Sequence, residues 1–434
     1  MSTSSNKTIS RRSFVKGATT LAVMSALPIT VGAAGRVIKI GYISPQTGPL
    51  SSFSDSDDFI IEGFNNAVAG SADTYQVFIK DSQSNPNVAA SVAKELILDD
   101  EVDLILVGHT PETVNPVAIQ CEMEEVPCIS TLSPWQPTFI GQQANPRAPE
   151  TWEGLRYCYH FFWGIEDVIN VFTDMWNDLD TNRTVAGLFP NDTDGNAWGN
   201  EQTGFPKPLA SKGFSLVDPG RFQPLTDNFS AQISAFKQAQ AEIVTGVVIP
   251  PDFATFWSQS KQQGFNPKVV SIGKAILFPS AVKALGAGAH NLSSEIWWSP
   301  EHPYSSSLTN QSSSVLANAY EASSNRAWTQ PIGFVHALFE LAVDVMSRTG
   351  KPSNSDDVVS SIKETNLNTI VGNVNWNGEG VPDFAKQNVT KTKLVGGQWR
   401  VGESGASSLD LKITNNKRAN EIATQDVTRP IDWS

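Results

Sequence analysis

Short runs of β-branched residues alternate with helical stretches from residue 37 onward, and this order limits the fold more than any other feature of the chain. The run VIKIGYI at residues 37–43 predicts a strand, and the apolar spacing within residues 57–69 predicts the helix that follows it. Further strands are expected at 75–80, 102–107 and 126–130, and further helices at 87–98 and 114–125. Such alternation is typical of a mostly parallel sheet with helices on both faces.

A second series of the same kind begins near residue 184. Strands are expected at 184–189, 214–217, 243–249, 268–272 and 295–298, and helices at 198–212, 229–240, 253–264, 332–349 and 358–365. The chain has 434 residues, which is too many for one ordinary domain of about 100–200 residues. We therefore predict an α/β protein of two lobes with a cleft between them. Ligands of open α/β sheets bind beyond the carboxyl ends of the strands, so candidate site residues are sought there.

The amino-terminal segment has the pattern of an export signal. The run SRRSFVK at residues 10–16 is a twin-arginine motif, and a weakly apolar run at 17–31 and small residues at 32–34 follow it. The apolar run is shorter than the ~20 residues of a spanning helix, and no other stretch comes close. We expect residues 1–34 to be a twin-arginine signal peptide and the mature protein to be soluble in the periplasm. An amphipathic first helix with an incidental arginine pair is the alternative.

Charge and cysteine content exclude several classes of protein. Lys and Arg number 31 against 44 Asp and Glu, for a formal charge of −13, and an acidic surface disfavours a nucleic-acid partner. Cys121, Cys128 and Cys158 are too few for a disulfide scaffold, and no CxxC pair suggests a zinc or redox site. In an oxidising compartment Cys121 and Cys128 could form a disulfide, and two buried thiols are the equal alternative.

The sequence lacks the motifs of catalytic and cofactor-binding proteins. Its five histidines are scattered, with no HExxH spacing, and there is no GxSxG, no P-loop and no complete GxGxxG. No nucleophile or general base can be matched to an orienting partner from the spacing of residues. We expect no enzymatic activity, no cofactor and no metal, and keep an exported α/β enzyme as the less favoured alternative.

Several short motifs occur together in a characteristic order. They are IKIG followed by GPL, LVGH, VPCIS, NAWG and VGNVNW, and they span about residues 37–400. In this order the chain resembles the periplasmic solute-binding proteins of ABC importers of the branched-chain (hydrophobic) amino-acid or amide type. The resemblance implies the type I periplasmic binding fold, with two Rossmann-like lobes of mainly parallel sheets joined by a three-crossover hinge.

The resemblance also implies lobe boundaries and a role. Lobe 1 would be residues 36–160 plus 299–370, and lobe 2 would be 161–296 plus 371–434, with crossovers near 159–164, 295–299 and 369–375. The protein would be a monomer that captures a small solute and delivers it to a permease in the inner membrane by closing its hinge. A binding protein that feeds a sensor receptor is the alternative within this class.

Six candidate ligand contacts of lobe 1 follow predicted strands, at positions that the resemblance suggests. Phe53 stands where relatives place an aromatic ring over the ligand, or it caps the next helix as a hydrophobic staple. The loop with His109, Thr110 and Thr113 would offer hydroxyls and the N–H groups of a helix start, which suit an anion, although helix capping is an equal alternative. Ser133 would supply another hydroxyl.

Trp135, the sixth of these residues, would add an aromatic ring, and packing inside the lobe is the alternative.

Three candidate contacts lie in lobe 2. Trp198 stands where relatives place a tyrosine that closes on the solute, and Asp252 either reaches the cleft or caps a helix. Lys274 replaces the acidic residue that pairs with the ammonium of amino-acid ligands in relatives. Either the solute is an anion, or an internal acid such as Asp252 pairs with Lys274, or the lysine is solvated. The lysine argues against a plain α-amino acid, and the 12 tryptophans suggest a flat or apolar solute. With the resemblance, this predicts an amino-acid-like solute, with an aromatic or carboxylate anion as one form of it.

Overall fold

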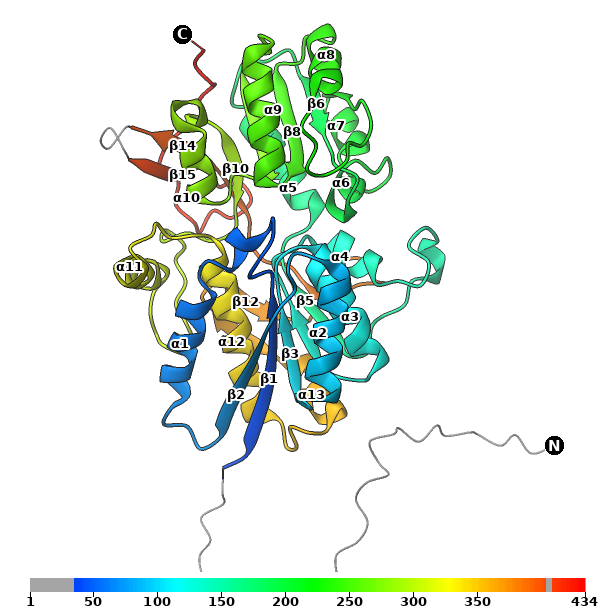
Figure 1. Ribbon diagram of the computed structural model, residues 1–434, viewed down its shortest axis with the longest axis vertical. Helices are drawn as coiled ribbons and strands as arrows, with labels where there is room; N and C mark the ends of the chain where they lie inside the picture. Colours follow the sequence, from blue (N-terminus) through cyan, green and yellow to red (C-terminus); the bar gives the residue numbers. More distant parts are fainter. Residues whose placement is uncertain (1–34, 403–407, 434) are drawn as a thin grey trace, which may run out of the picture. The chain divides into compact units, whose positions relative to one another are not determined.

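The structure is a computed structural model, and it describes residues 35–402 and 408–433 (Figure 1). The twin-arginine signal predicted for residues 1–34 lies outside the described residues. From Val37 onward the described residues belong to one compact unit that contains two large sheets. In the part of the chain that the structure describes, no helix is long and apolar enough to cross a membrane.

The first large sheet, sheet A, is entirely parallel. Its strand order is β13-β5-β4-β3-β1-β2. The strands are β1 (Val37–Ser44), β2 (Thr74–Asp81), β3 (Leu104–Val107), β4 (Cys128–Ser130), β5 (Cys158–Phe161) and β13 (Val389–Thr390). The helical elements of this half are η2 (Ser51–Ser54), α1 (Asp57–Val68), α2 (Pro86–Leu98), α3 (Pro111–Met123), α4 (Trp135–Gly141), η3 (Pro149–Thr151), α11 (Ser313–Ser324), α12 (Pro331–Arg348) and α13 (Ser355–Lys363).

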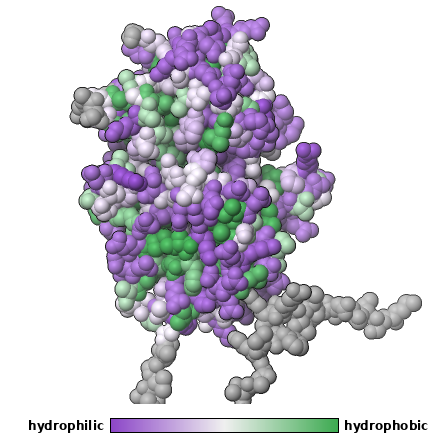
Figure 2. Space-filling model, in the orientation of Figure 1, coloured by the Kyte–Doolittle hydropathy of each residue, from purple (hydrophilic) through white to green (hydrophobic). Residues whose placement is uncertain are grey.

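Helices cover both faces of sheet A because its central strands are apolar on both sides. Leu104 and Leu106 of β3 pack in one buried cluster with α1 and α12, whereas Ile105 and Val107 pack in another with α2 and α3. Successive side chains of a strand point to opposite faces, so a continuous apolar run such as LILV needs cover on both. Figure 2 shows a mainly hydrophilic face on which hydrophobic residues gather over sheet A.

The second large sheet, sheet B, is mixed. Its strand order is β15-β14-β10-β9-β8-β6-β7, and β14 is antiparallel to both of its neighbours. The strands are β6 (Thr184–Leu188), β7 (Ser215–Val217), β8 (Ile243–Val248), β9 (Val269–Lys274), β10 (Ser293–Ile296), β14 (Val395–Val401) and β15 (Leu409–Asn415). The helical elements of this half are α5 (Ile165–Trp176), α6 (Thr193–Trp198), α7 (Pro206–Ser211), α8 (Ser230–Gln238), α9 (Pro250–Gln262), α10 (Pro279–Ala284) and η4 (Gly286–Ala289).

The chain passes between the two sheets after β5, after β10 and after β13. Residues 369–375, where the resemblance placed the third crossover, lie instead in and between the strands of a hairpin of β11 (Asn366–Thr369) and β12 (Gly372–Asn375). The third passage is at residues 391–394, because β13 still pairs with β5 of sheet A. The two-lobe α/β architecture is confirmed, and the division of residues between the lobes stays a prediction.

Two further differences from the expected elements concern helices. The single helix expected at 198–212 is two short helices, α6 and α7, because Gly199 and Gly204 interrupt it and Pro206 can only begin a new helix. The amphipathic α5 and α11 were not predicted, although α5 buries one whole face.

The cysteines are free, buried thiols, so the disulfide between Cys121 and Cys128 that the sequence left open is not formed.

A buried carboxyl group on α12, that of Glu340, accepts hydrogen bonds from two segments of the chain. One segment connects β10 to α11, and the other lies at the end of β11. Glu340 accepts hydrogen bonds from the backbone N–H of Ser307 at 2.5 Å and of Ile370 at 3.0 Å, and from the hydroxyl of Ser307 at 2.8 Å. Only 1 % of Glu340 is exposed, so water cannot replace these bonds. Glu340 therefore fixes the connection between β10 and α11 and the end of β11 against the same helix.

Glu340→Leu should destabilise the protein strongly, because it leaves the buried N–H of Ile370 and the part-buried N–H of Ser307 without an acceptor. We expect the free energy of unfolding to fall by about 2–5 kcal/mol. Asp344→Ala, one turn further along α12, removes only the partly exposed pair with Arg348 and should cost about 1 kcal/mol or less. Urea unfolding followed by tryptophan fluorescence measures both. Equal losses for the two variants would contradict the role given to Glu340.

Candidate functional site

The carboxyl ends of strands from both sheets meet around one small cavity. Its volume is about 30 Å³, which is room for roughly one water molecule. Its lining comes from the ends of β3, β4, β5, β8, β9 and β10 or from the residues after them, and from η2 and α6. The lining residues are Phe53, Thr110, Leu132, Pro134, Phe162, Trp163, Asp194, Trp198, Val247, Lys274, Leu277, Glu295 and Trp297. The two halves of the protein therefore face each other across this cavity, which itself has no room for a molecule of the size of an amino acid.

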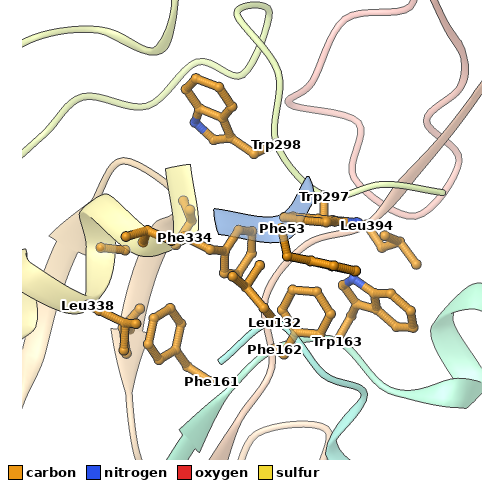
Figure 3. Packing of buried hydrophobic residues seen from close by; sticks show 14 of the residues in the cluster. Phe53, Leu132, Phe161, Phe162, Trp163, Trp297, Trp298, Phe334, Leu338 and Leu394 are labelled. Carbon is orange, nitrogen blue, oxygen red and sulfur yellow. The ribbon is translucent and has the colours of Figure 1, made fainter. Parts of the chain in front are cut away.

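Aromatic rings supply much of the lining. The ring of Phe162 lies 4.8 Å from that of Trp163 and 5.4 Å from that of Trp297, centroid to centroid. Figure 3 shows these rings and Phe53 gathered from separate segments of the chain. Phe53 also meets Phe278, which precedes α10, edge to face at 4.7 Å. Apolar contact between the two sheets is thus made mainly by rings.

A buried ion-pair cluster crosses from one half of the protein to the other. The ammonium of Lys274, at the end of β9, lies 2.6 Å from a carboxylate oxygen of Asp194 and 3.9 Å from one of Glu112. Glu112 belongs to the first turn of α3 and also accepts the backbone N–H of Thr193 at 3.2 Å. Asp194 belongs to the first turn of α6, and carboxylates are favoured at such helix starts. The cluster links α3 beside sheet A to α6 and β9 of the other half.

Carboxyl groups outnumber the ammonium in this cluster. Burial raises the pKa of Asp194 to about 7, and Glu112 and Asp192 add to the rise while Lys274 opposes it. Burial likewise raises the pKa of Glu295, beside the cavity, to about 8. Burial alone would lower the pKa of Lys274, but the attraction of Asp194 and Glu112 outweighs it, and the pKa lies well above its usual range. Lys274 is therefore a charged lysine that is already paired.

Four of the residues predicted from sequence line the cavity, namely Phe53, Thr110, Trp198 and Lys274. Trp198 is also packed inside its own half, stacked on Phe205 at 4.9 Å. His109 lies immediately beside the cavity, buried, with its ring 5.9 Å from that of Phe53.

The backbone around the cavity is strained. His109, Thr110, Leu132 and Lys274 all have positive φ angles, of 78°, 80°, 63° and 68°. This left-handed region is sparsely populated by residues other than glycine, and such strain is concentrated at binding and active sites.

The other predicted contacts are engaged elsewhere in the described chain. Thr113 faces Ser82 at 3.4 Å between hydroxyls, and Ser133 accepts a hydrogen bond from Thr138 at 2.7 Å. The indole of Trp135 donates to Glu166 at 3.2 Å. A role for these three in solute binding stays a prediction.

Asp252 accepts the backbone N–H of Leu225 at 3.1 Å. The suggested pairing of Lys274 with Asp252 is wrong, because the acids beside Lys274 are Asp194 and Glu112.

Sequence reasoning missed Glu112 and Asp194 as partners of Lys274, and Phe162, Trp163 and Glu295 as lining residues. Phe162 and Trp163 follow β5, and Glu295 lies within β10, so a complete search of strand ends would have found them. Among residues 35–402 and 408–433, no three His, Cys, Asp or Glu side chains are grouped so that they could hold a metal ion.

Comparisons with known proteins agree with this architecture. A family model described as "Periplasmic binding protein" matches residues 37–394. No curated protein sequence matches the chain. The leucine-binding protein LivK of Thermotoga maritima is similar in structure, with 16 % identity and a TM-score of 0.69 over 86 % of this chain and 97 % of that one.

Two further solved structures were determined with ligands. The LivJ branched-chain amino acid transporter substrate-binding protein of Streptococcus pneumoniae, in complex with isoleucine, has 13 % identity and a TM-score of 0.66 over 88 % of this chain and 100 % of that one. A solute-binding protein of an ABC transporter from R. palustris, in complex with 4-hydroxybenzoate, has 15 % identity and a TM-score of 0.67 over 92 % and 98 %. At these identities the likeness shows the fold, which is the type I periplasmic binding fold.

His109→Phe should make the protein less sensitive to acid. Burial lowers the pKa of His109 to about 3, whereas a histidine of the unfolded chain has a pKa near 6.5. Stability from the neutral ring is therefore complete above pH ~6.5 and is lost as the pH falls towards 3. In that window the variant should lose less stability than the original chain, by up to about 1.4 kcal/mol per pH unit. Urea unfolding at several pH values measures this, and parallel pH profiles would contradict it.

Proposed function

Since this chain belongs to the periplasmic binding protein family, we propose that it is the substrate-binding component of an ABC importer. In this role it captures a small, amino-acid-like solute outside the inner membrane and delivers it to a membrane permease. The twin-arginine signal predicted at residues 1–34 is the export route of this proposal. The observation that carries the proposal is the cavity at which the strand ends of both sheets meet.

The lining of the cavity supports small-solute capture. Concave sites with apolar and aromatic walls and a few polar groups are typical of small-molecule binding. Phe53, Thr110, Trp198 and Lys274 are the proposed contacts, with His109 behind Phe53. Solved proteins of this fold are described in complex with isoleucine and with 4-hydroxybenzoate, so the fold accepts solutes of this size.

Solute entry requires the two halves to separate. A cavity of about 30 Å³ is far too small for an amino acid, so the contacts across it must open before a solute can enter. Glu112 with Thr193 and Lys274, and Phe53 with Phe278, are such contacts. A solute bound by both halves favours the closed state only through contacts that the open state lacks. The permease then recognises the closed arrangement.

A thermal-shift screen combined with small-angle scattering tests the proposal. A solute present at about 100 times its Kd should stabilise the purified protein by about 2.7 kcal/mol and raise its melting temperature. The same solute should change the radius of gyration as the two halves close on it. The panel should contain amino acids, amines, aromatic acids and short carboxylates. A panel without any thermal shift or change in scattering would refute the proposed function.

Glu112→Ala should shift the balance between closed and open forms towards the open form in the absence of solute. The variant removes the ion pair with Lys274 and the acceptor for the N–H of Thr193, which both join the two halves. We expect a larger radius of gyration than in the original chain. Glu62→Ala, which removes an exposed carboxylate from α1, is the matched control and should leave the radius unchanged. Identical scattering from the two variants would mean that Glu112 does not hold the halves together.

A further inference from the structure

Carboxyl groups outnumber ammonium groups around the cavity. Those of Glu112, Asp192 and Asp194 interact with the ammonium of Lys274, which Asp194 already contacts at 2.6 Å, and that of Glu295 accepts the backbone N–H of Lys274 at 3.4 Å. A carboxylate brought into this cluster would meet further carboxylates and would have to take Lys274 away from its partners. Desolvating a charge without a partner costs several kcal/mol. An anion is therefore the solute that the cluster accepts least easily.

Buried polar atoms without a hydrogen-bond partner in the described chain lie among the lining residues. One carboxylate oxygen of Asp194 and the hydroxyl of Thr110 are such atoms, and both residues are about 98 % buried. Both atoms can accept a hydrogen bond from a charged N–H group. Unpartnered buried acceptors are costly, so they indicate a ligand that completes them.

The aromatic walls suit a positive charge as well. The rings of Phe53, Phe162, Trp163, Trp198 and Trp297 all line the cavity. The face of an aromatic ring attracts a cation, most strongly for tryptophan and where water is excluded. The indole N–H groups of the three tryptophans have no partner within the described residues and could donate to a neutral oxygen of the same solute.

We propose that the solute is an organic cation, with a positively charged nitrogen held between Asp194, Glu112 and the aromatic rings. The inference rests on the proposed function, because it names the charge of the solute captured at that site. Lys274 then lines the site and holds Asp194 and Glu112 in place, and it does not pair with a solute carboxylate. The proposal covers alkylammonium and quaternary ammonium ions, which share this chemistry.

Matched solutes separate charge from shape. Isopentylamine, leucine and 4-methylpentanoate share the same isobutyl group and are a cation, a zwitterion and an anion. Choline and 3,3-dimethyl-1-butanol have the same shape, with and without a positive charge. Isothermal titration calorimetry of the purified protein should give choline or isopentylamine an affinity at least about tenfold higher than its matched partners. Which of the two cations binds more tightly distinguishes quaternary from primary ammonium.

Variants test whether the acids carry the selectivity. Asp194→Asn should weaken binding of the preferred cation by about tenfold or more, while Asp383→Asn, at an exposed acid that pairs with Lys386, makes the same change of charge and should leave it unchanged. If Asp194→Asn does not fold, as judged by circular dichroism, Glu112→Gln takes its place with the same expectation. Equal affinities in the acid variant and the control would overturn the proposal.

The failures of the two proposals can be told apart. Tight binding of leucine or 4-methylpentanoate without binding of either amine would overturn the cationic solute and leave the solute-binding function intact. Equal affinity for choline and 3,3-dimethyl-1-butanol, with equal affinity across the leucine series, would also overturn it, because charge would then play no part. Binding of none of the five, with a thermal shift from another member of the panel above, would overturn the cationic solute alone, and no shift from any member would reject both proposals.

Discussion

A lysine buried where the two halves of the protein meet must be neutralised, and the structure around the cavity depends on how this is done. Lys274 is only 6 % exposed, and its partners Asp194 and Glu112 begin helices on opposite sides of the cavity. Each acid lies in a first helical turn, where free N–H groups stabilise its charge. One cation thus fixes the relative positions of α3, α6 and the end of β9. Packing of rings around it excludes water and makes these charges interact more strongly.

Much of the fold could be predicted because strand and helix periods are local properties of the sequence. The run before Ser44, the spacing within α1 and the apolar stretch of α12 each specify their element without help from the rest of the chain. The resemblance placed the third passage between the sheets near residues 369–375, where the structure has the hairpin of β11 and β12. Only pairing of β13 with β5, between residues more than 220 positions apart, shows where the chain leaves sheet A.

The lining of the cavity was predicted in part, because strand ends and helix starts are also local features of the sequence. Phe53, Thr110, Trp198 and Lys274 could be found because a strand end or a helix start marks each of them. The partners of Lys274 could not, since the distance between Glu112 and Lys274 depends on how the two sheets approach each other. Local patterning does not encode that distance. Solved structures with 13–16 % identity share the backbone arrangement, and the charges on it are set by each sequence separately.

Residues with left-handed backbone surround the cavity, and this has a consequence for attempts to redesign the protein. Thr110, Leu132 and Lys274 hold conformations that glycine would adopt freely, and they direct the carbonyl and side-chain groups of three different strand ends. Replacing them by glycine would relieve the torsional energy and loosen the loops. Substitutions intended to raise thermal tolerance are therefore better placed in the outer helices than in these loops.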